Sequence, residues 1–163
     1  MNAKLQRIGG LLTCAIALVE RWFAPVADLA VRLYIAQVFF NSGLTKVMDW
    51  DTTIALFTDE YKVPVLPPAV AAVMGASGEL FFPVLLVLGL GGRLGALGLT
   101  FVNIMAVVSY WHVLMAPEQM AGLYNHYQWA LMIALLLAHG PGTLSLDAWI
   151  KRRWNAGADA RTM

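Results

Sequence analysis

The sequence has little charge for its length. Of its 163 residues only 13% are charged, whereas a soluble domain carries about 25%. Hydrophobic residues make up 60% of the chain, and its mean hydropathy is +0.66. This composition is typical of an integral membrane protein, so the lipid bilayer is its first expected partner.

Cysteine is also nearly absent, since Cys14 is the only one. One cysteine excludes an intrachain disulfide, a CxxC redox pair and a thiolate metal cage built by a single chain. Its apolar surroundings in the sequence favour a packing role for Cys14. A redox function would therefore need a cofactor, a substrate quinone or a partner protein. The formal net charge of +1 offers no basic patch for nucleic acid.

The N-terminal segment, residues 1–27, combines basic and apolar residues. Lys4 and Arg7 precede an apolar run over 8–19, as in a signal peptide, but the run is shorter than the roughly 20 residues that span a bilayer. Its apolar residues follow helical spacing. We predict an amphipathic helix in the membrane interface, with a cleaved signal as the alternative. We expect Pro25 to break the chain between this helix and the first span.

Four apolar stretches predict membrane-spanning helices over 28–46, 69–90, 94–115 and 123–139. Gly91 to Arg93 predict a tight turn, and the glycines and proline at 140–142 stop the last helix. The 49–62 loop is expected to hold a short helix capped by Asp51, with Ile54, Phe57 and Tyr61 on one face.

The placement of lysine and arginine predicts the topology. With the N-terminus in the cytoplasm, eight of the eleven lie inside and two outside, while Arg32 lies in a span. The predicted fold class is thus an all-α membrane protein, a four-transmembrane-helix bundle with both termini in the cytoplasm of a bacterial plasma (inner) membrane. The membrane domain covers 28–150, and 151–163 form a basic cytoplasmic tail.

Three polar residues fall at one predicted depth, near the bilayer centre: Gln37, Glu79 and Asn103. A carboxylate there must be protonated or paired with a cation or hydrogen-bond donors, so Glu79 is the first candidate catalytic residue. Pro83 frees the Glu79 carbonyl from its helical donor, which predicts a kink. That kink is either part of a binding site or a bend satisfied by its neighbours.

The first span carries a polar stripe, formed by Gln37, Asn41 and Thr45 at four-residue spacing. Arg32 lies on another side of this helix. It either extends to the cytoplasmic interface or forms an ion pair with Glu79, which makes it the second catalytic candidate. The candidate ligand-binding residues are Gln37, Asn41, Asn103 and Tyr110.

Two histidines, His112 and His126, are expected near the outer surface among aromatic residues. Histidines in an interfacial aromatic belt are a common anchoring pattern. Without a fixed spacing, the two give little support for a metal site, and none is predicted.

Three stretches in order carry a family resemblance: RLYIAQVFFNSGLTKVMDW (32–50), GASGELFFPVLLVLGLGGRLGAL (75–97) and HGPGTLSLDAWI (139–150). With these, the chain resembles the DoxX family of small four-helix membrane proteins over about 28–150. The resemblance implies that nine positions are typical of the family: Arg32, Gly43, Lys46, Glu79, Gly89, Arg93, Gly142, Ser145 and Asp147. The chain departs from the family at Asn41-Ser42-Gly43, where an apolar-histidine-glycine sequence is more usual, so any chemistry of that histidine is missing here.

The resemblance implies a limited set of functions. Some relatives are linked to thiosulfate oxidation with quinone as the electron acceptor, and others are encoded beside oxidoreductases. Our leading hypothesis is an inner-membrane subunit of a redox system that binds a quinone or a similar apolar ligand. One alternative is a non-catalytic membrane anchor or assembly factor for a partner protein or a homo-oligomer. A further alternative is the transport of a small solute or metal ion.

Overall fold

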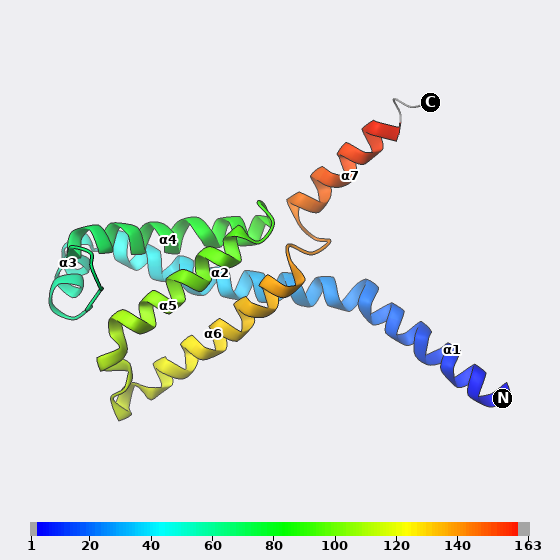
Figure 1. The fold of residues 1–163 in the computed structure, drawn as a ribbon, viewed down its shortest axis with the longest axis horizontal. Helices are drawn as coiled ribbons and strands as arrows, with labels where there is room; N and C mark the ends of the chain where they lie inside the picture. The colour runs from blue at the N-terminus through cyan, green and yellow to red at the C-terminus, as the bar shows by residue number, and fades with distance from the viewer. Residues whose placement is uncertain (1–2, 160–163) are drawn as a thin grey trace.

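The computed structural model describes residues 3–159, and side chains over 7–155 (Figure 1). The described chain is helical and contains no strand. In chain order the elements are α1 (Ala3–Leu18), the π-helical turn η1 (Val19–Phe23), α2 (Ala24–Met48), α3 (Trp50–Asp59), α4 (Pro68–Leu88), α5 (Leu94–Leu114), the 3-10 turn η2 (Pro117–Gln119), α6 (Met120–His139) and α7 (Leu146–Asp159).

Three helical stretches are long and apolar enough to cross a membrane: Arg7–Met48, Pro68–Leu88 and Leu94–Leu114. The first has 42 residues. At 1.5 Å per residue it is about 63 Å long, twice the hydrocarbon thickness of a bilayer, so only part of it can lie in hydrocarbon. The fourth expected span forms as α6, but that helix is not among the three.

The expectation that Pro25 breaks the chain is wrong. Helix continues from α1 through η1 into α2, and Pro25 lies in the first turn of α2. A proline ring clashes with the carbonyl four residues earlier and offers that carbonyl no N–H. The wider π-helical turn accommodates this, since the Ala24 N–H bonds to Val19 O, five residues back. The helix therefore bends near this point without ending (Figure 1).

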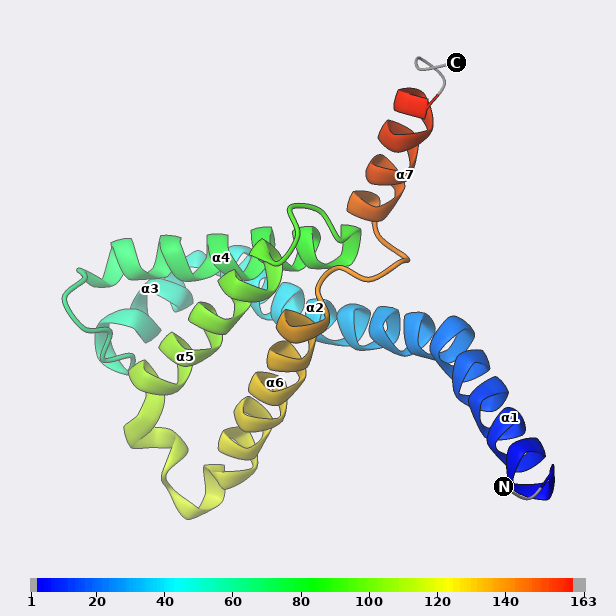
Figure 2. The same cartoon turned by 45° about the vertical axis from the view of Figure 1, so that its right-hand side comes forward.

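Helices α2, α4, α5 and α6 enclose the main core. Ile35, Leu99 and Ile133 are fully buried at its centre, with Phe39 and Leu86 beside them. Helices α2 and α4 run side by side in opposite directions (Figures 1 and 2). Large apolar side chains such as Phe81, Phe101 and Leu131 point outward. An apolar exterior around an apolar core is what a protein dissolved in lipid requires.

The short helix expected in the outer loop forms as α3, with a different cap. Asp49, not Asp51, accepts the Thr52 N–H at 3.1 Å. Interactions with the Thr52 side chain and with the Thr52 N–H lower the pKa of the Asp49 carboxyl. Ile54, Phe57 and Tyr61 share a buried face against Ala71 and Ala72 of α4, as predicted. The Phe57, Tyr61 and Tyr110 rings stack edge to face in series, and burial raises the pKa of Tyr61.

Candidate functional site

Helices α2 and α4 approach each other closely at Gly43. A Cβ added to Gly43 would lie 3.0 Å from Glu79 Cβ and 2.9 Å from Leu80 Cγ, closer than real side chains pack. Gly43 thus lets the two backbones approach, as small residues do in membrane helix pairs. This approach places Glu79 of α4 within reach of the last turn of α2.

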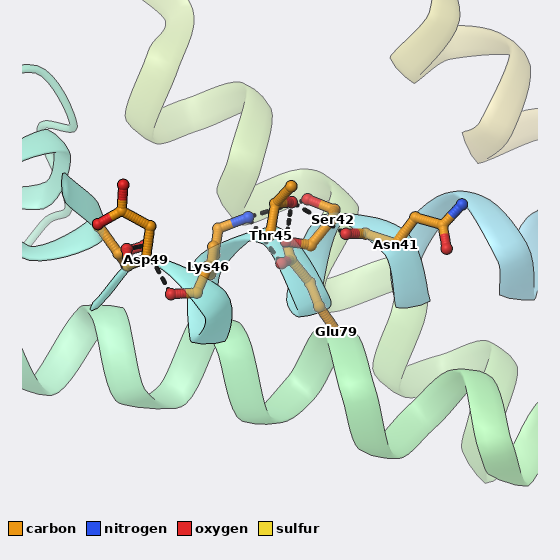
Figure 3. A network of polar contacts seen from close by, with 7 residues as sticks. Asn41, Ser42, Thr45, Lys46, Asp49 and Glu79 are labelled. Atoms are coloured by element: carbon orange, nitrogen blue, oxygen red, sulfur yellow. Dashed lines mark hydrogen bonds and ion pairs between the residues drawn. The ribbon is translucent and has the colours of Figure 1, made fainter. Parts of the chain in front are cut away.

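Lys46 and Glu79 form an ion pair at this approach (Figure 3). The Lys46 Nζ donates to Glu79 Oε2 at 2.7 Å and to Ser42 Oγ at 2.9 Å. The side chains are only 16% and 9% exposed. Removing either partner would leave a largely buried charge without compensation, which is costly, so the pair holds both groups in place. Each residue comes from a different helix, and the pair therefore fixes the register of α2 against α4.

Arg32 lies at the opposite end of α2 and is 3% exposed. Its guanidinium donates to three main-chain carbonyls: to Leu144 O at 2.7 Å, to Val87 O at 3.1 Å and to Pro141 O. Val87 lies in the last turn of α4, where free carbonyls and the helix dipole favour a cation. Arg32 therefore joins α2 to the end of α4 and to the α6–α7 loop.

Arg32 does not pair with Glu79, which was one of the two predicted outcomes. Lys46, the partner of Glu79, lies 14 residues beyond Arg32, about 21 Å along the helix axis. The other outcome, extension to the cytoplasmic interface, stays a prediction: the Arg32 head reaches the end of α4, where it is buried against carbonyls. The two candidate catalytic residues thus belong to separate contacts.

A second set of contacts surrounds Arg32 at the α4–α5 turn. Gly89 ends α4 with a φ of 60°, and a Cβ there would contact Ser145 Cβ and lie 3.0 Å from Arg32 Nη1. The Asp147 carboxylate accepts the Gly91 N–H at 3.1 Å and the Gly92 N–H, and the Asp147 N–H donates to Gly89 O at 3.2 Å. These bonds attach the start of α7 to the α4–α5 turn. We call this set, with Arg32, the arginine network.

Two more pairs close the same end of the molecule. Arg93 donates to Leu137 O, and to Ala138 O at 3.1 Å, so it caps the end of α6. His139 Nδ1 lies 3.0 Å from Asp28 Oδ1 on α2. Helices α2, α4, α5, α6 and α7 are all tied together here.

The predicted polar layer of Gln37, Glu79 and Asn103 does not form. Gln37 is exposed, as are Asn41 and Thr45 of its stripe on α2. Asn103 Nδ2 donates to His126 O at 3.1 Å, and its Oδ1 lies 2.8 Å from His126 Nδ1. The prediction failed because equal depth does not fix the direction in which a side chain points.

The other predicted polar residues also have separate partners. Tyr110 donates to Glu60 Oε2 at 2.9 Å in the loop after α3. His112 lies exposed beside the Tyr110 ring, while His126 stacks on Trp129. Within the part of the chain that the structure describes, no group of three or more His, Cys, Asp or Glu could hold a metal ion.

An open groove lies between α2 and α4, with a cavity volume of about 420 Å³. Gln37 is its one polar side chain, and Pro83 forms part of its α4 wall. The other lining residues are Leu33, Ala36, Phe40, Val84, Val87 and Leu88. The groove thus offers one amide among apolar walls. It lies between the ion pair and the arginine network, because Gln37 is between Arg32 and Lys46 on α2.

Sequence reasoning missed the role of Lys46, which it placed at the outer end of the 28–46 span. Its i, i+4 spacing from Ser42 places both on one face of a helix. A lysine in the last turn of a helix can also turn back toward a buried acid. That combination would have named Lys46 as the cation that Glu79 requires.

Several long apolar helices with a lipid-compatible exterior and buried ionic contacts define an integral, multi-pass membrane protein. The DoxX family model matches residues 27–112, and the chain belongs to the DoxX family. A Haemophilus influenzae protein described as uncharacterized is 31% identical over 133 residues, covering 78% of this chain and 85% of that protein. No solved structure matches the chain.

The nine positions at which the sequence resembles the family fall into the two contacts described above. Gly43, Lys46 and Glu79 make the ion pair and the close approach. The other six lie in or beside the arginine network: Arg32, Gly89, Arg93, Gly142, Ser145 and Asp147. Residues far apart in sequence thus form two local sets of contacts, one toward each end of α2.

Proposed function

We propose that this protein binds a quinone-like ligand in the α2–α4 groove and serves a redox system of the bacterial plasma membrane. The observation that carries the proposal is the groove itself, about 420 Å³ and lined by apolar side chains and Gln37. Ligand pockets are typically about 300–1,000 Å³, mostly apolar, with a few polar groups that orient the ligand. A groove on the lipid-facing side suits a ligand dissolved in the bilayer.

Gln37 would orient the ligand. Its amide can donate to a carbonyl oxygen and accept from a hydroxyl, so it can bind both the quinone and the quinol form. In hydrocarbon such a bond has no competition from water. The apolar walls would hold the isoprenoid or aromatic part.

Glu79 would exchange one of the two protons that reduction of the quinone to the quinol takes up. It lies one turn before Pro83 in α4, about 6 Å along the axis from this groove residue. Lys46, rather than Arg32, would hold its carboxylate in place. Electrons would come from a partner, since the described side chains suggest no metal cluster and the sequence has no cysteine pair.

The topology that we propose has α2, α4, α5 and α6 crossing the membrane with both termini in the cytoplasm. Arg21, Arg93 and Lys151 all belong to the end of the molecule where α2 begins and α4 and α6 end. An excess of lysine and arginine is typical of the cytoplasmic side. Histidine, asparagine and glutamine side chains lower the hydropathy of α6. One of them, His126, pairs with Asn103 inside the bundle, so its polarity does not oppose a membrane span.

Binding of a short-chain ubiquinone analogue to the purified protein in nanodiscs tests the proposal. Gln37→Leu removes the amide and keeps an apolar side chain of similar size. Gln128→Leu is the matched control, because Gln128 is an exposed amide on α6 outside the groove. We expect saturable binding by the wild type and the control, and affinity lower by about tenfold in Gln37→Leu, as for one lost hydrogen bond. No binding by the wild type, or equal binding by all three, would refute it.

A second candidate function is that of a membrane anchor for a partner protein. It is favoured by α1, which extends from the bundle with exposed apolar residues such as Ile8, Leu11 and Leu12. Photo-crosslinking from Leu11 in native membranes would test it. Crosslinks to lipid alone would count against this function.

A further inference from the structure

Helix α7 presents an apolar face that nothing in the described structure covers. Leu146, Trp149, Ile150 and Trp154 are all exposed, Trp154 at 80%. At 100° per residue these side chains fall within an arc of about 140° on one side of the helix. Two tryptophans at the edges of an apolar arc are typical of a helix that lies in a membrane interface.

Basic residues surround this face. Lys151 and Arg152 lie on either side of the arc, and Arg153 lies within it. The Arg153 guanidinium stacks over the Trp149 ring, with 5.2 Å between Cζ and the ring centroid, which shields its charge from the apolar side. Arg152 is held to the helix by a hydrogen bond to Ala148 O at 3.2 Å.

The start of α7 is fixed to the end of the bundle. The Ala148 N–H donates to Ser145 Oγ at 3.2 Å, an N-cap bond, and Asp147 binds the Gly91 and Gly92 amides of the α4–α5 turn. Because that turn joins two apolar helices, it marks the level at which the chain leaves the hydrocarbon. The anchoring therefore sets α7 at the depth of the lipid headgroups.

Helix α7 projects away from the end of the bundle. In Figures 1 and 2 it runs at an oblique angle to α4 and lies beyond the end of that helix. An amphipathic helix in this position can bury its apolar face among acyl chains and set its basic residues among headgroup phosphates.

We propose that α7 is a binding surface for anionic phospholipid headgroups. Trp149, Ile150 and Trp154 insert at the acyl boundary, and Lys151, Arg152 and Arg153 bind the phosphates. The occupant is the protein's own membrane surface, on the cytoplasmic side in the topology proposed above. This inference does not depend on the groove or on its ligand.

Spin labels on the full chain test this proposal. Cys14→Ser removes the one cysteine, and Ile150→Cys or Asn155→Cys then places a nitroxide on the apolar or the opposite face of α7. The protein is studied in nanodiscs of phosphatidylcholine alone or with phosphatidylglycerol. Accessibility to oxygen and to a water-soluble nickel chelate reports depth, and the two-component spectrum gives the ratio of bound to free α7.

We expect the label at position 150 to be reached by oxygen and the one at 155 by nickel. Phosphatidylglycerol should raise the bound fraction, and each neutralised residue among Lys151, Arg152 and Arg153 should lower the bound-to-free ratio about fivefold. Neutralising Arg7, Arg21 and Lys62 together is the control for total charge and should leave the ratio unchanged.

Three results would overturn the proposal. Nickel access at both positions would place α7 in water. Equal bound fractions in the two lipid mixtures would remove the anionic preference. A label at 150 that neither reagent reaches would mean that protein, such as a second copy, covers the face.

Discussion

Lys46 of α2 and Glu79 of α4 lie 2.7 Å apart, one turn from the point at which Gly43 lets the two helices touch. The acid that the sequence places inside a membrane helix is therefore neutralised by a lysine from the end of a neighbouring helix. Ser42 accepts a second hydrogen bond from the same ammonium group. The pair holds α2 and α4 in register on one side of the groove, and Arg32 holds them on the other.

The losses of stability on removing each of the two charges alone should add up to more than the loss on removing both together. Lys46→Met or Glu79→Leu alone leaves a largely buried charge unpaired and should lower the free energy of unfolding by about 3 kcal/mol. The double variant should lose less than the sum of the two. Thermal unfolding in detergent, followed by circular dichroism, gives the coupling energy. Additive losses would show that the pair contributes nothing.

Gly43→Ala should separate α2 from α4, because the new Cβ would lie within 3.0 Å of Leu80 and Glu79. We expect a loss of stability of about 1–3 kcal/mol, as for overpacked cores. Gly9→Ala in α1 is the matched control, since nothing lies within 4 Å of its added Cβ. It should be neutral or stabilising, because alanine favours helix. A similar effect of both changes on the melting temperature would contradict the close approach.

Arg32→Lys should loosen the end of the bundle although it keeps the charge. A lysine ammonium cannot reproduce the planar fork that reaches Val87 O, Pro141 O and Leu144 O together. Faster amide exchange over 140–147 should result, measured by hydrogen–deuterium exchange and mass spectrometry. Arg21→Lys, at an exposed arginine, serves as the control and should leave exchange there unchanged. Unchanged exchange in Arg32→Lys would exclude a role for the fork.

A comparison of Gly89→Ala with Gly92→Ala distinguishes destabilisation by backbone strain from destabilisation by close contact of the new side chain. Both glycines have positive φ, 60° and 65°, so alanine is strained at each by roughly 1 kcal/mol. Only at position 89 does the new Cβ also meet Ser145 and the Arg32 guanidinium. Gly89→Ala should therefore lower the melting temperature clearly more than Gly92→Ala. Equal shifts would mean that Gly89 is needed only for its backbone conformation.

The cap of α3 should weaken in acid. Because the interactions with Thr52 lower the pKa of Asp49 in the folded protein, their stabilisation is present above the ordinary aspartate pKa. It is lost as the pH falls below that value and through the lowered pKa. The protection factor of the Thr52 amide, which is its intrinsic exchange rate at each pH divided by the observed rate, should fall over this interval in the wild type. Asp49→Asn keeps a capping oxygen and should remove the pH dependence; a persistent dependence would point to another carboxyl group.

The helices themselves were predictable from local sequence. Apolar runs between glycine and proline turns gave α2, α4, α5 and α6 to within a few residues at most ends, because each run must bury its backbone polar groups in helix. The predicted break at Pro25 is wrong because proline is tolerated in the first turn of a helix and because a π-helical turn precedes it. Asp49 replaced Asp51 as the cap because α3 begins at Trp50, two residues before the start at Thr52 that an Asp51 cap implies.

The sequence alone determined that this is a helical membrane protein with one isolated acid, Glu79, that needs a cation. Composition and hydropathy suffice for that, since they act residue by residue, while the resemblance to the DoxX family came from three ordered stretches of the sequence. Only the tertiary structure decided that Lys46 is this cation, that Arg32 binds carbonyls, and that Gln37 faces a groove. Partner choice depends on the register and rotation of packed helices, which one added Cβ at Gly43 would change and which no local pattern encodes.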